Sequence, residues 1–373
     1  MSAPRGSRVV VVGGGPAGAA AALALARAGR SVLLIDASAE GAFRVGEALP
    51  PAARPLLRDL GVLDRFLADG HLRCHANASA WGSPEVHTND FIFNAHGHGW
   101  HLDRARFDAL LRGAAHEAGA ELLPRARLAA AEPAPGGGFL LRLAGECAAA
   151  IACAWVVDAT GRSAAVARGQ GAARVQGDRL VAFFARLRSA QGSDRDTRTL
   201  IEACPDGWWY TARVPSGERV VAYLTDADLA DRRALLSRDG FVARLAGTVH
   251  VRAVLAAHAY SLHGRPRGAD AGSACLVPFA GPGWLAAGDA ALSFDPLSSQ
   301  GILTSLYTGM LAGQALHAHL SGESGALARY LHRLGAIGEA YWRNRAAFYA
   351  YEARWPERPF WRRRSGMLSE VEA

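Results

Sequence analysis

The chain has 373 residues and contains no lysine, so all 41 of its basic side chains are arginine. Charged residues make up only 20% of the chain, against 50% hydrophobic residues, which excludes a globally disordered protein. The net charge of +7 is spread along the chain, and its one local run, residues 362–364, is short. We therefore expect no nucleic-acid partner.

Cysteine and long apolar runs are also scarce. Five cysteines, an odd number with no C-x-x-C spacing, argue against a disulfide framework and for a reducing compartment. No apolar run approaches the ~18 residues needed to span a bilayer. An Ala-rich stretch after Arg5 and Arg8 resembles a secretory signal, but Gly13, Pro16 and Gly18 interrupt it. The sequence predicts a cytoplasmic protein without a membrane span.

The N-terminal part of the sequence has the pattern of a βαβ unit. The run Val9–Val12 predicts a strand buried on both faces, Ala17–Ala28 predicts a helix, and residues 31–35 predict a second buried strand that ends at Asp36. The turn between the first strand and the helix reads Gly13-x-Gly15-x-x-Gly18. This context favours a dinucleotide-binding site over a purely structural turn.

Each residue of this turn has a physical role. Gly13 permits the tight turn, Gly15 lets the backbone approach a pyrophosphate, and Gly18 lets helix and strand pack closely. Pro16 and Ala17 begin the helix whose N-terminus attracts the pyrophosphate. The Asp36 carboxylate can accept hydrogen bonds from the adenosine ribose and disfavours a 2′-phosphate. This motif alone does not separate FAD from NAD.

Two further glycine-containing turns follow predicted buried strands. The first reads Asp158-Ala159-Thr160-Gly161-Arg162, and the second begins with Gly288-Asp289. Turns at the carboxyl ends of strands fit the crevice where open α/β sheets bind ligands. A loop and the start of a predicted helix follow the second turn. A proline stiffens this loop. The N-terminus of the helix can stabilise negative charge on a reduced flavin ring. The candidate residues of this loop and helix start are Pro296, Ser298, Ser299, Gln300, Gly301 and Ile302.

Together the three motifs resemble the FAD-dependent monooxygenase superfamily, whose fold is shared by aromatic hydroxylases, flavin halogenases and geranylgeranyl reductases. The resemblance covers residues 7 to 310. It implies that the first motif holds the ADP half of FAD, that Asp158, Thr160 and Gly161 lie near the cofactor, and that Gly288 and Asp289 contact its ribityl chain.

A narrower resemblance points to the halogenase-like branch. The segment Val45–Pro51, with Glu47, is similar to a Gly-Glu-x-x-x-Pro segment that lies along the flavin, and Arg44 directly precedes it. The segment 97–108 resembles one whose arginine, here Arg104, helps to hold FAD. The aromatic tail 342–364 is similar to flavoproteins that oxidise a Trp side chain during tryptophylquinone maturation.

The sequence also departs from the halogenases. Halogenases of this branch use a lysine to capture hypohalous acid, and this chain has none. Their Trp-x-Trp-x-Ile-Pro motif, which is associated with restrained monooxygenation, is matched only by the segment 210–215, where both tryptophans are replaced. We therefore expect a monooxygenase that hydroxylates an aromatic, indole-type substrate, including peptidyl tryptophan, through a flavin C4a-hydroperoxide. The alternatives are a maturation flavoprotein that acts as a stable partner of its polypeptide substrate, and a flavin-dependent reductase or dehydrogenase.

Few side chains are demanded by that chemistry. The candidate catalytic residues are Glu47, Pro296 and Ser298, although Glu47 equally suits a structural role. Candidate substrate contacts are His98, Trp208 and Tyr210, with core packing and structural roles as the alternatives. We predict no metal site. The chain shows no second Rossmann unit, so NAD(P)H or a partner flavin reductase would reduce the FAD.

The expected fold class is α/β: a Rossmann-type, glutathione-reductase-like FAD-binding domain with an inserted antiparallel-sheet substrate domain and C-terminal helices. Helices are expected within residues 47–70 and over residues 229–245. The predicted FAD-binding domain comprises residues 1–75, 100–171 and 276–325. The substrate domain comprises 76–99 and 172–275, and 326–373 form the C-terminal helical segment.

Overall fold

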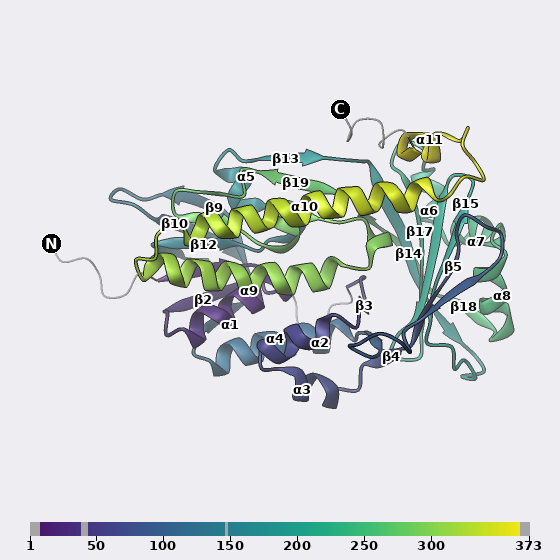
Figure 1. Cartoon of the computed structure of the whole chain (residues 1–373), viewed down its shortest axis with the longest axis horizontal. Coiled ribbons are helices and arrows are strands. Elements are labelled where there is room, and N and C mark those ends of the chain that lie inside the picture. The colour runs from purple at the N-terminus through teal and green to yellow at the C-terminus, as the bar shows by residue number, and fades with distance from the viewer. Residues whose placement is uncertain (1–7, 39–43, 146–147, 366–373) are drawn as a thin grey trace.

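Two large sheets, three small sheets and the helices around them make up the computed structural model, which describes residues 8–38, 44–145 and 148–365 (Figure 1). The first sheet is parallel except for one edge strand. Its strands, in order across the sheet, are β20 (Ala280–Gly281), β21 (Trp284–Ala286), β12 (Trp155–Asp158), β1 (Val9–Val12), β2 (Val32–Asp36) and β8 (Glu121–Pro124). This Rossmann-type sheet confirms the predicted α/β class.

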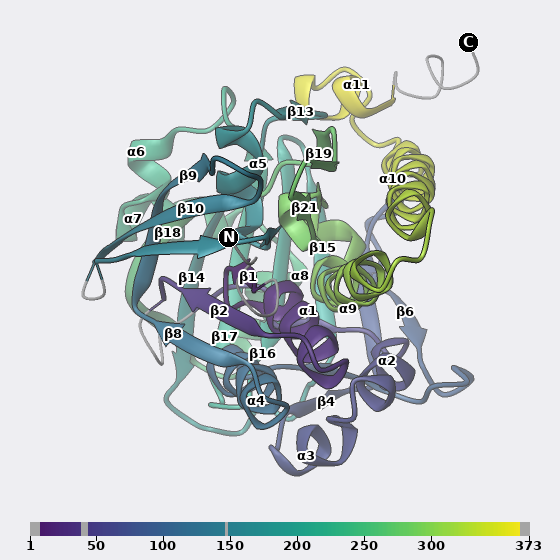
Figure 2. The same cartoon turned by 90° about the vertical axis from the view of Figure 1, so that its left-hand side faces the viewer.

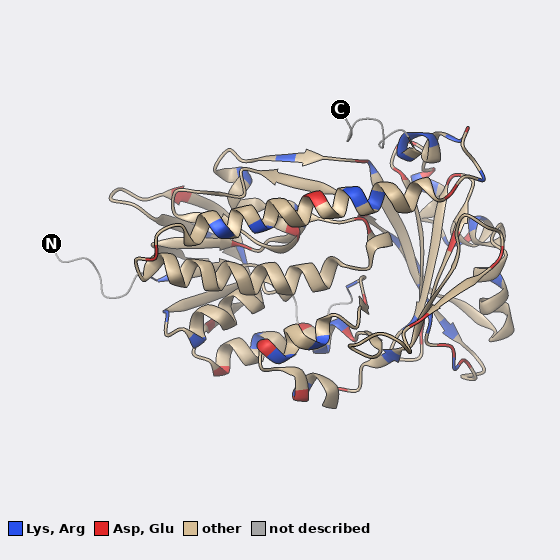
Figure 3. Cartoon of the chain, viewed as in Figure 1, with Lys and Arg blue, Asp and Glu red and all other residues tan. Residues whose placement is uncertain are grey.

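Helices cover the Rossmann-type sheet because its central strands are apolar on both faces. On one side α1 (Pro16–Arg27) packs between α4 (Arg104–Glu117) and α9 (Gly301–Leu320), as Figure 2 shows. Small residues allow the closest approach, since a Cβ placed on Gly309 would lie 2.1 Å from the Ala17 carbonyl oxygen. Helix α9 carries no Asp, Glu or Arg (Figure 3). Because Gly313 in turn packs on Ala21, the two helices run parallel, and residues 301–308 of α9 extend beyond the start of α1.

The second large sheet has seven strands and is antiparallel except where β15 meets β5. Its order is β18 (Tyr260–Asp270), β14 (Leu180–Ser189), β17 (Arg219–Asp226), β16 (Gly207–Arg213), β15 (Thr199–Cys204), β5 (Ala76–Ala80) and β6 (His87–Asp90). One face, with Trp209 and Tyr223, packs against α7 (Arg238–Ala246) and α8 (His250–Ala257). The opposite face, with Trp208 and Leu224, turns toward the Rossmann-type sheet and the C-terminal helices.

Three small sheets complete the framework. One consists of β9 (Ala126–Pro133), β10 (Phe139–Gly145) and β11 (Ala150–Cys153); a second of β13 (Ala173–Gln176), β19 (Ala274–Val277) and β22 (Leu292–Ser293); and a third of β3 (Ala48–Leu49), β7 (Gly99–His101) and β4 (Leu72–Cys74). The remaining helices are α2 (Ala53–Asp59), α3 (Leu63–Ala68), α5 (Ala165–Gly169), α6 (Arg232–Leu235), α10 (Ala326–Ala350) and α11 (Pro359–Ser365).

The structure differs from two of the local expectations. The helical stretch expected within 47–70 begins with strand β3, because Leu49 pairs with Trp100 of β7, and only then forms α2 and α3. The single helix expected over 229–245 is divided, because Ser237 caps a new helix by accepting from the Gly240 amide. The predicted domain boundaries stay a prediction.

No single helix of the described residues is long and apolar enough to cross a membrane, although α7 and α8 together, bent by 111°, meet a test of length and composition.

Candidate functional site: a cavity between the two large sheets

A cavity of about 770 Å³ lies between the carboxyl ends of the Rossmann-type strands and the seven-stranded sheet. This volume falls in the ~300–1,000 Å³ range of small-molecule and cofactor sites. Most of the residues predicted to bind cofactor line it, together with both aromatic candidates of β16. They are Gly13, Gly15, Pro16, Ala17, Asp36, Arg44, Glu47, Arg104, Thr160, Gly161, Asp289, Pro296, Ser299, Gly301 and Ile302, with Trp208 and Tyr210.

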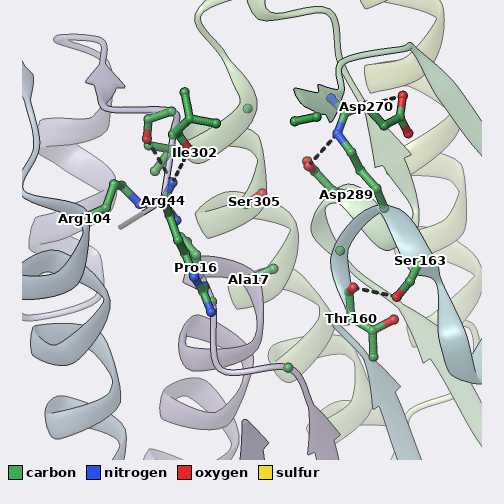
Figure 4. Close-up of a pocket in the computed structure, with 18 of the residues that line it drawn as sticks. Pro16, Ala17, Arg44, Arg104, Thr160, Ser163, Asp270, Asp289, Ile302 and Ser305 are labelled. Atoms are coloured by element: carbon green, nitrogen blue, oxygen red, sulfur yellow. Dashed lines mark hydrogen bonds and ion pairs between the residues drawn. The ribbon is translucent and has the colours of Figure 1, made fainter. Parts of the chain in front are cut away.

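The N-terminus of α1 opens directly into this cavity (Figure 4). Gly15 stands at the N-cap and makes no side-chain cap, which leaves the first turn of the helix to a ligand. A Cβ on Gly15 would meet only Arg44 Nη1, at 3.8 Å. The space between the helix end and this guanidinium therefore suits a bridging anion such as a pyrophosphate, and the residues present fit FAD or another dinucleotide.

The other glycines of the turn serve packing. A Cβ on Gly18 would lie 1.8 Å from the Gly13 carbonyl oxygen, and one on Gly13 would lie 2.1 Å from the Ala159 carbonyl oxygen. Gly13 also has φ +111°, a conformation that only glycine adopts without strain. Gly18 thus contacts the strand and does not line the cavity, in agreement with the packing role that the spacing predicts.

Asp36 ends β2 beside the same turn and is almost buried. Its carboxylate lies 3.4 Å from Arg112 Nη1 of α4, which also donates to the Gly14 carbonyl at 3.2 Å. Arg112 therefore fixes both the acidic side chain and the glycine turn. Arg112 was not predicted from the sequence, because nothing in the amphipathic pattern of α4 indicates which arginine faces the glycine turn.

A second missed residue, Asp108, organises the two predicted arginines. Its buried carboxylate lies 3.2 Å from Arg44 Nη1 and 3.2 Å from Arg104 Nη2. Arg104 also donates to the Gly46 carbonyl at 2.9 Å. The i,i+4 spacing of Arg104 and Asp108 was a usable signal. One carboxylate thus holds two guanidinium groups at the cavity edge, where Figure 4 shows Arg44 near Pro16 and Ile302 and Arg104 on the other side of Arg44.

The Asp158 turn is organised from beneath the cavity. Asp158 is buried and accepts hydrogen bonds from the Thr160 amide at 3.0 Å, the Thr160 hydroxyl at 2.7 Å and the Ala167 amide at 2.8 Å. Burial raises the pKa of this carboxyl, against the effect of these bonds. Asp158 therefore shapes the turn, whereas Thr160 and Gly161 line the cavity.

The Gly288-Asp289 turn faces Arg162, the last residue of the Asp158 motif. Arg162 Nε lies 3.6 Å from the Asp289 carboxylate, and its Nη2 donates to the Phe294 carbonyl at 2.9 Å. Gly288 has φ +61° and packs on Ala17, since an added Cβ would lie 2.6 Å from the Ala17 Cβ. Asp289 lines the cavity, and Gly288 supports the turn behind it.

The segment between Asp295 and α9 forms a tight loop with Ser299 at φ +51°. Pro296, Ser299, Gly301 and Ile302 line the cavity. Ser298 turns its hydroxyl back to the Asp295 carbonyl at 2.8 Å, and neither Ser298 nor Gln300 is a lining residue. Helix α9 begins at Gly301, so its N-terminus meets the cavity beside α1.

The cavity wall on the seven-stranded sheet is apolar apart from Asp270, at the end of β18, and the Tyr210 hydroxyl, which pairs with Glu47. Small and apolar side chains, Ala182, Ala222, Leu224, Ala269 and Ala271, line it with the fully buried Trp208. The Tyr210 hydroxyl donates to Glu47 Oε1 at 2.6 Å, and the Gly46 amide donates to Glu47 Oε2 at 3.0 Å. Burial is the main reason that the pKa of Glu47 is raised, and the pKa of Tyr210 lies well above its usual value.

The neighbouring Trp209 and the candidate His98 lie outside the cavity. Trp209 belongs to the opposite face of the sheet and stacks on Tyr223 at 5.0 Å between ring centroids. His98 is not a lining residue; its ring contacts His75 and Trp100, with centroid distances of 5.3 Å and 4.8 Å. The structure therefore brings Trp208 and Tyr210 to the cavity but places His98 outside it.

Comparison with known proteins identifies the family to which this chain belongs. A model of the FAD binding domain family matches residues 7–344. LodB of Marinomonas mediterranea, a putative FAD-dependent oxidoreductase, is 30% identical over 363 residues, which cover 95% of this chain and 96% of that protein.

Two solved structures extend the comparison. The flavin-dependent halogenase CmlS superimposes with a TM-score of 0.86 at 23% identity, over 99% of this chain and 70% of that one. QhpG, a peptidyl tryptophan dihydroxylase essential for tryptophylquinone cofactor biogenesis, has a TM-score of 0.78 at 25% identity, over 97% of this chain and 79% of that one. The chain therefore belongs to the FAD binding domain family, as an FAD-dependent oxidoreductase of the halogenase-like monooxygenase branch.

Proposed function

We propose that FAD lies with its ADP half along the N-terminus of α1 and the end of β2, where Gly13, Gly15 and Asp36 line the cavity. Arg44 and Arg104 neutralise the pyrophosphate, and the turns at residues 158–161 and 288–289 support the ribityl chain. The ring then faces the α9 N-terminus and the apolar wall of the seven-stranded sheet. In this arrangement each of the three glycine-containing motifs contacts one part of the proposed FAD.

The proposed reaction is hydroxylation of an indole-type ring, with the tryptophan side chain of a polypeptide as the favoured substrate. Bound FAD, once reduced, supplies the activated oxygen, and the protein positions the substrate and excludes water. The electrons come from NAD(P)H or from a separate flavin reductase. The likeness to a peptidyl tryptophan dihydroxylase over 97% of the chain supports this substrate class.

The Glu47–Tyr210 pair at the apolar wall carries the proposal. An indole ring needs a flat apolar surface, which Trp208 and the small side chains of the wall provide. Addition of oxygen to the ring is completed by loss of a ring proton, and a carboxyl with a raised pKa is suited to accept it. We assign this role to Glu47, with Tyr210 orienting it through the 2.6 Å hydrogen bond.

The other two catalytic candidates have indirect roles in this proposal. Pro296 lines the cavity and stiffens the loop before α9. Ser298 acts through its hydrogen bond to the Asp295 carbonyl, which holds the same loop.

The test uses the FAD-loaded protein with a flavin reductase, NADH and air. Its probes are free L-tryptophan and a synthetic polypeptide that contains a single tryptophan. We expect intact-mass and peptide analysis to show one or two added oxygen atoms on a tryptophan side chain, with no halogen incorporated when bromide is present. Halogenated product, or reduced substrate without added oxygen, would overturn the proposal.

Matched variants separate catalysis from binding. Glu47→Gln keeps the size of the side chain and is expected to lose most of the product while FAD still binds. Trp209→Phe changes a buried tryptophan on the opposite face of the same strand and is expected to retain activity. Equal losses in both variants would indicate general damage to the sheet and remove Glu47 from the proposed role.

A further inference from the structure

A line of indole rings leads from the cavity wall to the protein surface beneath the C-terminal helices. Trp208 lines the cavity and lies 6.3 Å from Trp81 between ring centroids. Trp81 lies 5.2 Å from Trp361 of α11, and Trp361 stacks on Trp355 at 6.0 Å. We call these four residues the tryptophan line. Each step falls within the ~4.5–7 Å over which aromatic rings contact one another.

Burial changes along the tryptophan line. Trp208, Trp81 and Trp361 are 0%, 6% and 2% exposed, whereas Trp355 is only half-buried. The two middle rings are fixed by their indole N–H groups, which donate to the Phe348 carbonyl at 2.9 Å and to the Cys204 carbonyl at 3.0 Å. The line therefore has one end in the cavity, two rigid interior members and one end that water reaches.

A tyrosine beside the cavity end can also exchange a proton. The Tyr349 hydroxyl accepts from Trp208 Nε1 at 3.2 Å and donates to the buried Asp295 carboxylate at 2.7 Å. Burial is the main cause of the raised pKa of Asp295, so this carboxyl is suited to take up a proton. Arg345 and Arg364 lie over the Tyr349 ring, at 4.9 Å and 5.1 Å from its centroid. Burial holds the pKa of Tyr349 well above its usual value, so the neutral side chain keeps its proton. The arginine charges disfavour a positive ring, so loss of an electron from Tyr349 would be coupled to transfer of its proton to Asp295.

We propose that the tryptophan line carries oxidising equivalents out of the flavin cavity to the surface at Trp355. With reduced flavin bound and no substrate present, reaction with O₂ would supply an oxygen-derived radical, to which Trp208 would give one electron and water one proton. Electrons then move inward from Trp81, Trp361 and Trp355 in turn. Trp355 finally loses its indole proton to water, and a soluble thiol or ascorbate-type reductant restores it with one electron and one proton.

Electrostatics gives this transfer an outward direction. A positive charge on a fully buried ring is costly, whereas Trp355 is in contact with water. Arg354 lies 4.3 Å from the Trp355 ring centroid, but its charge is paired with Glu352, whose Oε1 lies 2.8 Å from Arg354 Nε. The oxidised state is therefore most stable at the surface end of the line, away from the cavity.

Light provides a direct test on the FAD-loaded protein without substrate. After a blue-light flash, Trp208 gives one electron to the excited, bound FAD, and transient absorption follows the tryptophan radical. We expect a long-lived, deprotonated radical in the wild type. Trp355→Phe, at the surface, and Trp361→Phe, in the middle, are both expected to lose that long-lived signal, because the charge is then trapped near the cavity and recombines. Trp209→Phe leaves the line intact and should retain it.

A chemical readout tests the same path during turnover. The FAD-loaded protein is incubated with NADH, a flavin reductase and air without substrate, and oxygen addition is mapped by peptide mass spectrometry. The wild type should be oxidised at Trp355, and Trp361→Phe should shift the damage to Trp208 and Tyr210. Unchanged radical lifetimes in both line variants, or damage at the cavity that is the same with and without Trp361, would overturn the proposal and leave the rings as core packing.

Discussion

Replacing Glu47 by glutamine tests whether the cavity holds a carboxyl whose charge is suppressed. Glu47 is 2% exposed and accepts hydrogen bonds from Tyr210 and from the Gly46 amide. Burial raises its pKa above 4.5, and the hydrogen bonds and the charge of Arg104 offset this only in part. The native state therefore holds the Glu47 proton more tightly than the unfolded chain does. The stability that this provides is complete below pH ~4.5 and is lost as the pH rises through the folded-state pKa.

The size of the effect follows from this proton linkage. Between pH ~4.5 and the folded-state pKa, the free energy of unfolding of Glu47→Gln should rise relative to wild type by up to about 1.4 kcal/mol per pH unit. At acid pH the variant starts lower, because its amide nitrogen replaces the acceptor of the Gly46 N–H, at a cost of about 0.5–1.5 kcal/mol. The two stability curves are thus expected to cross on going to higher pH.

Urea unfolding followed by circular dichroism, from about pH 5 to about pH 8, measures this difference. Glu218→Gln is the control, because the pKa of Glu218 is shifted in the opposite direction from that of Glu47. Burial raises the pKa of Glu218, but hydrogen bonding from Arg188 and the charge of Arg186 outweigh it, and the net pKa is lowered. Its stabilising charge is complete above the unfolded pKa, so this variant should be destabilised by a constant amount in the same window. A flat difference for Glu47→Gln as well would refute the argument that burial suppresses its charge.

Three further substitutions have defined outcomes. Gly15→Ala places a methyl group between α1 and Arg44 and should weaken FAD binding about tenfold, or about 1.4 kcal/mol, in a fluorescence titration, without loss of helical circular dichroism. Asp36→Asn should weaken FAD by about 1.5–3 kcal/mol by calorimetry if the carboxylate holds the ribose; unchanged affinity would remove it from the site. Arg364→Met breaks a buried ion pair in which Arg364 Nη2 lies 2.6 Å from Asp226 Oδ1. It should lower the free energy of unfolding by about 3 kcal/mol, which is the lower end of the range for buried pairs. The loss stays at that end because Arg363 still contacts the Asp226 carboxylate. Thermal unfolding measures it, and a loss no larger than for surface pairs would contradict it.

The sequence predicted the parts of the fold that local patterns determine. The run Val9–Val12 is apolar on both faces because α1, α4 and α9 cover one side of the sheet, and α5 and the β9–β10–β11 sheet cover the other. Gly18 is required by its contact with Gly13, within one βαβ unit. The fold class followed from these patterns and from the order of the three motifs. Spacing alone was sufficient here, because the chain itself brings the strand end and the helix start together.

Contacts between distant segments were not predictable in the same way. Leu49 lies in a stretch with helical propensity but forms a strand because Trp100 pairs with it. Arg112 belongs to a helix that the sequence identified, yet its contact with the glycine turn depends on how α4 packs against α1. His98 has a side chain of the kind that often serves in active sites, but the loop places its ring against Trp100 and away from the cavity. In each case tertiary packing decides what a local pattern leaves open.

The absence of lysine has a chemical meaning that the family and the fold do not convey, because one fold supports several reactions. A halogenase of this branch needs an amine that can react with hypohalous acid. Arginine cannot take its place, since a guanidinium stays protonated and delocalised at all relevant pH values. Arg104 and Arg44 are moreover held by Asp108 at the cavity edge, away from the apolar wall. The apolar wall instead presents the Glu47–Tyr210 pair, which can exchange a proton but cannot carry a halogen. The proposal of hydroxylation therefore rests on the side chains of this wall more than on the fold.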